Sequence, residues 1–146
     1  MLLHFTDWLR HIARRWRWPA DLALGRRGED LAHRYLKQQG YIIVARNYRL
    51  ATGAGEADLI ARDGEDLVIV EVKSRRSGEH GPPERAVGEE KKRHLIRVAQ
   101  EYSRRSGIAW EYVRFDLVSV VDEHPPKIEL LRNVMLGPTR SGGARQ

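Results

Sequence analysis

The sequence predicts an α/β domain with a mixed β-sheet, built in the order α-β-β-β-α-β-β. Apolar residues recur at helical spacing in two separate stretches, and short runs rich in β-branched residues stand between and after them. Turn signals divide these runs. The 146 residues suffice for one compact domain with modest extensions. A domain of this size buries about two-thirds of its unfolded surface, so it can fold without disulfides or a structural metal.

The first half of the domain is expected to hold one helix and three strands. The helix is predicted over 20–39, where Leu24, Gly28, Leu31 and Tyr35 form an apolar stripe and Gly40 is suited to the C-terminal cap. The three strands are predicted over 41–50, 56–62 and 67–74. The last two strands flank Asp63-Gly64, which indicates a β-hairpin.

The second half is expected to begin with a mobile loop over 75–84, which contains two Gly and two Pro. A helix is predicted over 85–106, with an apolar side formed by Leu95, Val98, Ala99 and Tyr102. Two more strands are predicted over 112–121 and 127–131. The domain is therefore placed at 20–136, followed by a disordered tail over 137–146.

Residues 1–19 are predicted to be a basic, Trp-rich extension with a short amphipathic helix over 2–18. Three roles remain open for this helix: packing on the domain or on a second copy, binding a protein or nucleic acid, and lying on an anionic membrane. The chain has no run of 18 apolar residues and no apolar signal core, so we expect a cytoplasmic protein.

The net charge of +6 suggests an anionic partner, but the charge lies mostly at the two ends. Residues 1–18 carry +3 and residues 137–146 carry +2, which leaves the body nearly balanced. The absence of cysteine rules out a disulfide scaffold and a Cys-based zinc site, and the six His show no zinc-binding spacing. Composition and net charge therefore do not indicate the function, and only a specific site can.

Strand alternation places the hairpin's charged residues on one face. Glu71 and Lys73 share a side of their strand, whereas Val68, Val70 and Val72 share the other, apolar side. Glu71 and Lys73 should lie roughly 6–7 Å apart along the strand.

The length of the hairpin loop decides which acids meet. A two-residue loop at 64–65 pairs Asp58 directly with Glu71, whereas a loop at 63–64 pairs Glu56 with Glu71 and leaves Asp58 diagonal to it. Two facing carboxylates destabilise a hairpin unless a cation lies between them. Mg²⁺ prefers such oxygen ligands and uses one or two carboxylates with a phosphate. A solvated face with Lys73 as a salt-bridge partner is the competing interpretation.

Further residues could join this site. Glu29 borders the apolar arc of the first helix, and Gly25 and Gly28 would let that helix approach the sheet closely. An exposed acid in a first helical turn is the alternative for Glu29. Lys91 could face a phosphate or be a snorkelling lysine, and Arg75 and Arg76 follow the Glu71 strand as candidate phosphate contacts.

The residues carry a resemblance to the PD-(D/E)XK nuclease superfamily, in the branch of the Holliday-junction resolvases. The chain is most similar to the YraN-like family of uncharacterised bacterial proteins with a restriction-endonuclease-like fold. The matching segments span about 24–121 and comprise Gly25–Asp30, Leu36, Gly40-Tyr41, Arg46–Arg49, Gly55–Ile60, Val70–Lys73, Lys91, Leu95, Ala99 and Arg114–Asp116. Ala57 stands where the superfamily's name has proline.

This resemblance implies a three-layer restriction-endonuclease-like core and a Mg²⁺- or Mn²⁺-dependent nuclease. Glu29, Asp58 and Glu71 would be acidic metal-site residues and Lys73 the catalytic lysine. The implied substrate is DNA rather than RNA, with branched and single-stranded forms as candidates, and a homodimer is a candidate assembly. Two alternatives stay open: a nucleic-acid-binding module with this fold and little cleavage, and a protein-interaction adaptor.

Overall fold

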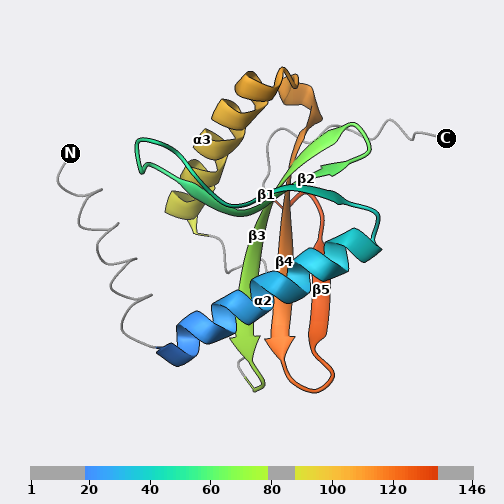
Figure 1. Ribbon diagram of the computed structural model, residues 1–146. Helices are drawn as coiled ribbons and strands as arrows, with labels where there is room; N and C mark the ends of the chain where they lie inside the picture. The colour runs from blue at the N-terminus through green and yellow to red at the C-terminus, as the bar shows by residue number, and fades with distance from the viewer. Residues whose placement is uncertain (1–18, 79–87, 135–146) are drawn as a thin grey trace.

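The computed structural model describes residues 19–78 and 88–134, and within these the order of elements agrees with the sequence prediction (Figure 1). The two helices are α2 (Pro19–Gln38) and α3 (Glu89–Ser106). The strands are β1 (Ile42–Arg49), β2 (Glu56–Asp63), β3 (Asp66–Arg76), β4 (Val113–Asp122) and β5 (Lys127–Leu131). A short 3-10 turn, η2 (Trp110–Tyr112), precedes β4. The predicted helix at 2–18, most of the predicted 75–84 loop and the 137–146 tail lie outside the described residues.

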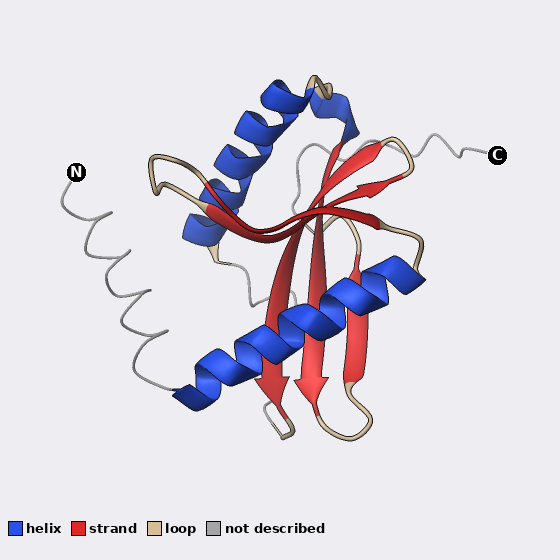
Figure 2. Ribbon diagram, in the orientation of Figure 1, coloured by secondary structure: helices blue, strands red, loops and turns tan. Residues whose placement is uncertain are grey.

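The five strands form one mixed sheet in the order β1-β2-β3-β4-β5. Neighbouring strands are antiparallel except β3 and β4, which are parallel and are connected through α3. Figure 2 shows α2 lying across β3, β4 and β5, while α3 lies beside the β1–β2 part of the sheet. The α/β class and the mixed sheet predicted from sequence are therefore confirmed.

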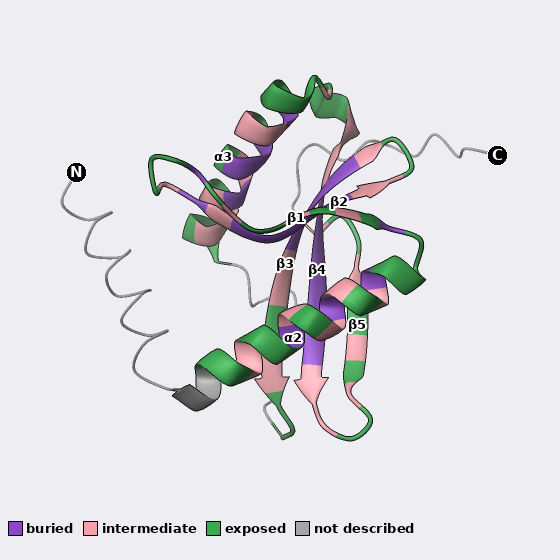
Figure 3. Ribbon diagram, in the orientation of Figure 1, coloured by how far each residue is buried: buried purple, intermediate pink, exposed green. Residues whose placement is uncertain are grey.

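Each helix covers its own apolar core, so the domain has three layers (Figure 3). On one side Ala32 and Leu36 of α2 pack with buried side chains of the central strands, namely Leu59, Ala61, Val68, Val70, Val118 and Val120. On the other side, the α3 residues Leu95, Val98 and Ala99 pack with Ile60, Leu67, Ile69, Phe115 and Leu117. The alternation in β3 predicts this division, because successive side chains of a strand point to opposite faces.

The sheet forks at the middle of β3. β2 and β3 pair from Asp63–Asp66 to Leu59–Val70, which is the register expected for a two-residue loop at 64–65. Beyond that point β2 continues its pairing with β1, and β3 continues with β4 as far as Arg76. The prediction that the loop begins at residue 75 is therefore wrong by two residues, because β4 provides a pairing partner for the end of β3.

Two glycines allow the helices to approach the fork. A Cβ atom at Gly28 of α2 would lie 1.8 Å from Ser74 Oγ of β3, and one at Gly55 would lie 2.8 Å from the His94 carbonyl oxygen of α3. No real Cβ could occupy either place without movement of a neighbour. The close approach predicted for Gly28 is confirmed. At Gly25, by contrast, a Cβ would meet no atom of the described residues within 4 Å.

A buried ionic network closes the opposite end of the β2–β3 hairpin. Arg114 of β4 donates to Asp63 and Asp66 at 2.8 and 3.1 Å and to both oxygens of the fully buried Asp116 carboxylate at 3.0 Å. The Tyr41 hydroxyl donates to Asp116 at 2.8 Å. Arg114 and Asp116 thus form a structural ion pair on one face of β4.

Among the described residues, neither helix combines the length and the apolar character needed to cross a membrane.

Candidate active site

Asp58 lies at the fork of the sheet and is almost fully buried, with 4 % of its surface exposed. Its Oδ2 atom accepts a hydrogen bond of 2.8 Å from the backbone N–H of Val72. Because β2 leaves β3 after Leu59, a carboxylate takes the place that a backbone carbonyl would hold in a continued ladder. The Asp58 side chain is thus fixed against β3, and a solvated hairpin face is excluded as its environment.

Glu71 lies on β3, next to Asp58 of β2. The Glu71 side chain is 17 % exposed. Its Oε2 atom is buried and has no hydrogen-bond partner in the part of the chain that the structure describes. Burial and the neighbouring Asp58 carboxylate raise the pKa of Glu71 from 4.5 to about 8, against the opposing effect of Lys91. An acid in this position binds a positive ion or a proton more readily than an exposed one.

The cation beside Glu71 is Lys91, from the first turns of α3. Its Nζ atom lies 3.4 Å from Glu71 Oε1, and 24 % of its side chain is exposed. Burial lowers the pKa of Lys91, but the charges of Glu71, Asp58 and Glu56 outweigh burial and raise it. Of the two sequence alternatives, Lys91 does face the acidic site, although its partner there is a carboxylate.

Lys73 and Glu29 are the other two predicted catalytic residues. Lys73 is exposed, on the same side of β3 as Glu71 by strand alternation. Glu29 is half-buried in the middle of α2 rather than in a first turn, so that alternative is wrong. Within 19–78 and 88–134, no three Asp, Glu, His or Cys side chains gather closely enough to hold a metal ion. The structure therefore brings Asp58 and Glu71 together without Glu29.

Glu56, at the start of β2, is the third acid near Lys91. Only 16 % of its side chain is exposed, and its Oε2 atom forms an ion pair of 3.2 Å with Arg49 Nε of β1. The charge of Glu56 is close enough to Lys91 to help raise the pKa of that lysine.

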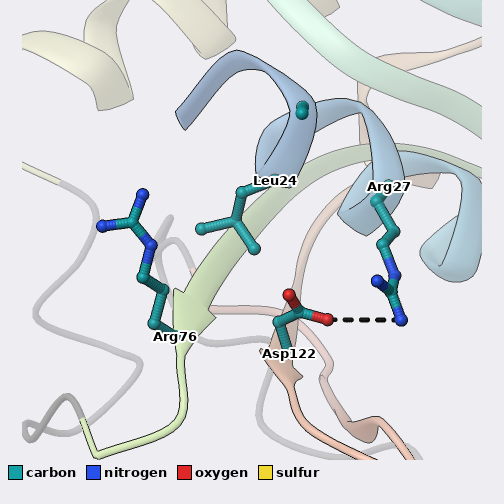
Figure 4. Close-up of a pocket in the computed structure, with 5 residues that line it drawn as sticks. Leu24, Arg27, Arg76 and Asp122 are labelled. Atoms are coloured by element: carbon teal, nitrogen blue, oxygen red, sulfur yellow. Dashed lines mark ion pairs between the residues drawn. The ribbon is translucent and has the colours of Figure 1, made fainter. Parts of the chain in front are cut away.

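Arg75 and Arg76 occupy the last positions of β3, beyond the fork. Arg76 lines a pocket of about 290 Å³ together with Ala23, Leu24, Arg27 and Asp122 (Figure 4). Arg27 Nη2 and Asp122 Oδ1 form an ion pair of 3.4 Å there. Arg76 is five residues from Glu71 along an extended strand, which is roughly 16 Å. The pocket is therefore separate from the acidic pair, at the outer end of the same strand.

A hard divalent cation fits the acidic pair. Mg²⁺ and Mn²⁺ prefer oxygen ligands, and Mg²⁺ is commonly held by one or two carboxylates, with water and phosphate completing its shell. Asp58 and Glu71 supply two carboxylates at the fork, and the partnerless buried Oε2 of Glu71 is an acceptor that a cation would satisfy. The sequence predicted this pair, but it gave no signal for the Val72 amide as a partner of Asp58.

The chain matches the model of the uncharacterised protein family UPF0102 over residues 28–120. A UPF0102 protein of Solibacter usitatus is 54 % identical over 119 residues, covering 82 % of this chain and 89 % of that protein. A second, from Rhodococcus jostii, is 47 % identical over 75 % of this chain and 92 % of its own length. A third, from Geobacter sulfurreducens, is 42 % identical over 75 % and 86 %.

The match to the family model covers the forked region that holds Asp58, Glu71 and Lys91, since it spans residues 28–120. The chain therefore belongs to the UPF0102 family, the YraN-like family that its sequence resembles.

Proposed function

We propose that the protein is a Mg²⁺- or Mn²⁺-dependent endonuclease that hydrolyses phosphodiester bonds in DNA. The observation that supports this most strongly is the Asp58–Glu71 pair, in which Oε2 of Glu71 is buried without a hydrogen-bond partner in the described chain. A buried, unpaired carboxylate oxygen is costly, and its retention beside a second acid favours a ligand-binding role over a structural one.

In this proposal Asp58 and Glu71 hold the cation, and Glu29 assists from α2 when substrate is bound. The bound cation supplies a water of lowered pKa and neutralises charge on the phosphate. The hydrogen bond from Val72 N–H fixes the Asp58 carboxylate, so that this side chain needs little reorganisation when the cation binds. Exposed Lys73 reaches the phosphate from the same side of β3 and stabilises the charge that develops there.

The nucleic acid is proposed to run along the outer half of β3. By strand alternation Arg75 shares the side of β3 that carries Glu71, so Arg75 and Lys91 of α3 can contact the backbone beside the acidic pair. Arg76 can contact the backbone at the outer end of the strand, where it lines the pocket with α2. Branched and single-stranded DNA are the substrates to test first. Cleavage of a junction requires paired cuts, so a homodimer is part of the proposal for that substrate.

A nucleic-acid-binding module with little cleavage is the second candidate. The Lys91–Glu71 ion pair favours it, because an internal ammonium already neutralises part of the acidic charge. In this case the fold and the basic residues are used for binding, and the acidic pair with Lys91 is a structural element.

The test combines cleavage with matched variants. Single-stranded, duplex and four-way-junction DNA are incubated with the protein in Mg²⁺, Mn²⁺ or EDTA. We expect cleavage that needs metal and falls at least about 100-fold in Asp58→Asn, Glu71→Gln and Lys73→Met. The controls are Glu129→Gln and Lys127→Met, which remove exposed charges on β5 and should cleave like the wild type.

Two outcomes would count against the enzyme. Salt-sensitive binding without cleavage, unchanged by the three site substitutions, would support the binding module. Cleavage that persists in Asp58→Asn and Glu71→Gln would mean that the acidic pair is not the active site.

A further inference from the structure

The carboxylate pair already has a positive partner from within the chain. Lys91 extends from α3 to Glu71, with Nζ 3.4 Å from Oε1, and about three-quarters of its side chain is buried. A cation held by Asp58 and Glu71 would have its charge beside this ammonium. Two positive charges in a partly buried site repel each other, so the ammonium and a divalent cation compete for Glu71.

We propose that Lys91 is the resident counter-ion of the acidic pair, which a divalent cation must displace from Glu71, and that the displaced ammonium becomes a ligand for a nucleic-acid phosphate. This inference rests on the proposed function, because it assigns to Lys91 the control of cation and phosphate binding at that same site.

The neighbourhood of Lys91 is suited to two positions of its side chain. Glu71 Oε1 forms an ion pair with the Lys91 ammonium, while Glu71 Oε2 has no hydrogen-bond partner in the described chain. Glu56 also acts on the charge of Lys91, from the opposite strand of the fork. A lysine side chain has four rotatable bonds, so Nζ can move by several ångströms while the methylene carbons nearest the backbone stay packed.

The backbone of α3 is held in place while the side chain moves. Gly55 packs directly on the His94 carbonyl, and Leu95 is buried in the core one turn after Lys91. We therefore expect the backbone of α3 to stay in place while the Lys91 side chain changes its conformation. Cation binding releases the Lys91 ammonium from Glu71, and a bound phosphate would hold the ammonium in that released position. The cation and the phosphate should therefore each strengthen the binding of the other.

Isothermal titration of the metal-free protein with Mn²⁺ tests this inference without relying on cleavage. Lys91→Met keeps the length of the side chain and removes the competing charge, so we expect Mn²⁺ to bind about tenfold more tightly than to the wild type. Lys91→Arg keeps a positive charge and should bind Mn²⁺ like the wild type. The matched control is Lys92→Met, since Lys92 pairs with the exposed Glu89 at 3.2 Å rather than with the site.

A second measurement tests whether the displaced Lys91 ammonium contributes to the binding of nucleic acid. Binding of a fluorescently labelled oligonucleotide is measured by anisotropy in EDTA and in Ca²⁺. We expect Ca²⁺ to tighten binding by the wild type and by Lys92→Met, and to do so at least threefold less for Lys91→Met. Lys91→Gln is measured in parallel, so that a folding defect of one variant does not decide the result; circular dichroism verifies that each variant folds.

The outcomes separate this inference from the proposed function. Equal or weaker Mn²⁺ binding by Lys91→Met and Lys91→Gln, with binding abolished by Glu71→Gln, would overturn the role of Lys91 and leave the metal site intact. If neither the wild type nor the Lys91 variants bind Mn²⁺, the metal site and this inference both fail. Mn²⁺ binding that appears only after Lys91 is replaced would support the inference strongly.

Discussion

At the scale of one residue, Glu71 shows a local conflict between burial and charge. Its carboxylate is buried beside Asp58, and Oε2 lacks a hydrogen bond within the described residues. The charged form is therefore disfavoured in the folded protein, which is why the pKa rises to about 8. The sequence predicted that Asp58 and Glu71 would share one face of the hairpin. The burial of Glu71 depends on the packing of α3 against the sheet, which no local sequence pattern reveals.

This raised pKa predicts a pH-dependent difference in stability between the wild type and Glu71→Gln. Between pH 4.5 and about 8, the folded state retains the proton that the unfolded state has lost, so the wild type loses stability as pH rises through this range. Glutamine does not titrate. We expect similar free energies of unfolding at pH 4 and a variant more stable by about 1–3 kcal/mol at pH 9.

Urea unfolding of the metal-free protein in EDTA, at several pH values, measures this difference directly. Glu129→Gln is the matched control, because it removes an exposed carboxylate on β5, away from the acidic pair. A Glu71→Gln effect that does not change with pH would show that Glu71 ionises normally in the fold.

A second prediction at this scale concerns two glycines. An alanine at Gly55 would place its Cβ 2.8 Å from a backbone carbonyl oxygen of α3, so we expect a loss of about 1–3 kcal/mol in the free energy of unfolding. Gly25→Ala, in the helix α2, meets no atom of the described chain and should be stabilising by about 0.5–1 kcal/mol. Thermal unfolding compares the two. Similar effects at both positions would contradict the close contact at Gly55.

At the scale of elements, the sequence predicted the type and order of the strands and helices because their apolar periodicity is strong. It did not predict their ends. β3 extends to Arg76 because β4 pairs with it in parallel, which is a contact between segments more than 40 residues apart. The register shift in the pairing of β1 and β2 between Ile43 and Ala45 was likewise not predicted, because no glycine or proline marks it in the sequence.

The Arg114 network predicts how strongly β4 is tied to the β2–β3 hairpin. In Arg114→Met the fully buried Asp116 loses its charged partner, so we expect the free energy of unfolding to fall by about 3–5 kcal/mol. Arg46→Met is the control, because its ion pair with the exposed Asp30 should contribute less than about 1 kcal/mol. Urea denaturation measures both. Equal losses would mean that the network has no special role.

At the scale of the whole molecule, the acidic pair is built from both sheet segments and is covered by α3. The sequence alone could place Asp58 and Glu71 on one face of the hairpin, because strand alternation is a local property, but it left two loop registers open. It could not choose a partner for Lys91, since the position of α3 over the fork is set by long-range packing of Leu95, Val98 and Ala99.

A divalent cation held at this junction should stabilise the entire fold. With Mn²⁺ at about 100 times its dissociation constant, we expect the midpoint of thermal unfolding to rise by about 5–10 °C. The rise should vanish in Asp58→Asn and remain in Glu129→Gln. Differential scanning calorimetry with Mn²⁺ and with EDTA measures it, and an equal rise in all three proteins would indicate nonspecific binding.

The fork also gives one carboxylate two tasks. Asp58 lies on β2 and Glu71 on β3, and beyond the Leu59–Val70 pair the Asp58 side chain joins the two strands through its hydrogen bond from Val72 N–H. The same carboxylate therefore belongs to the acidic pair and takes over, from a side chain, the linking role that main-chain groups perform in an unbroken ladder.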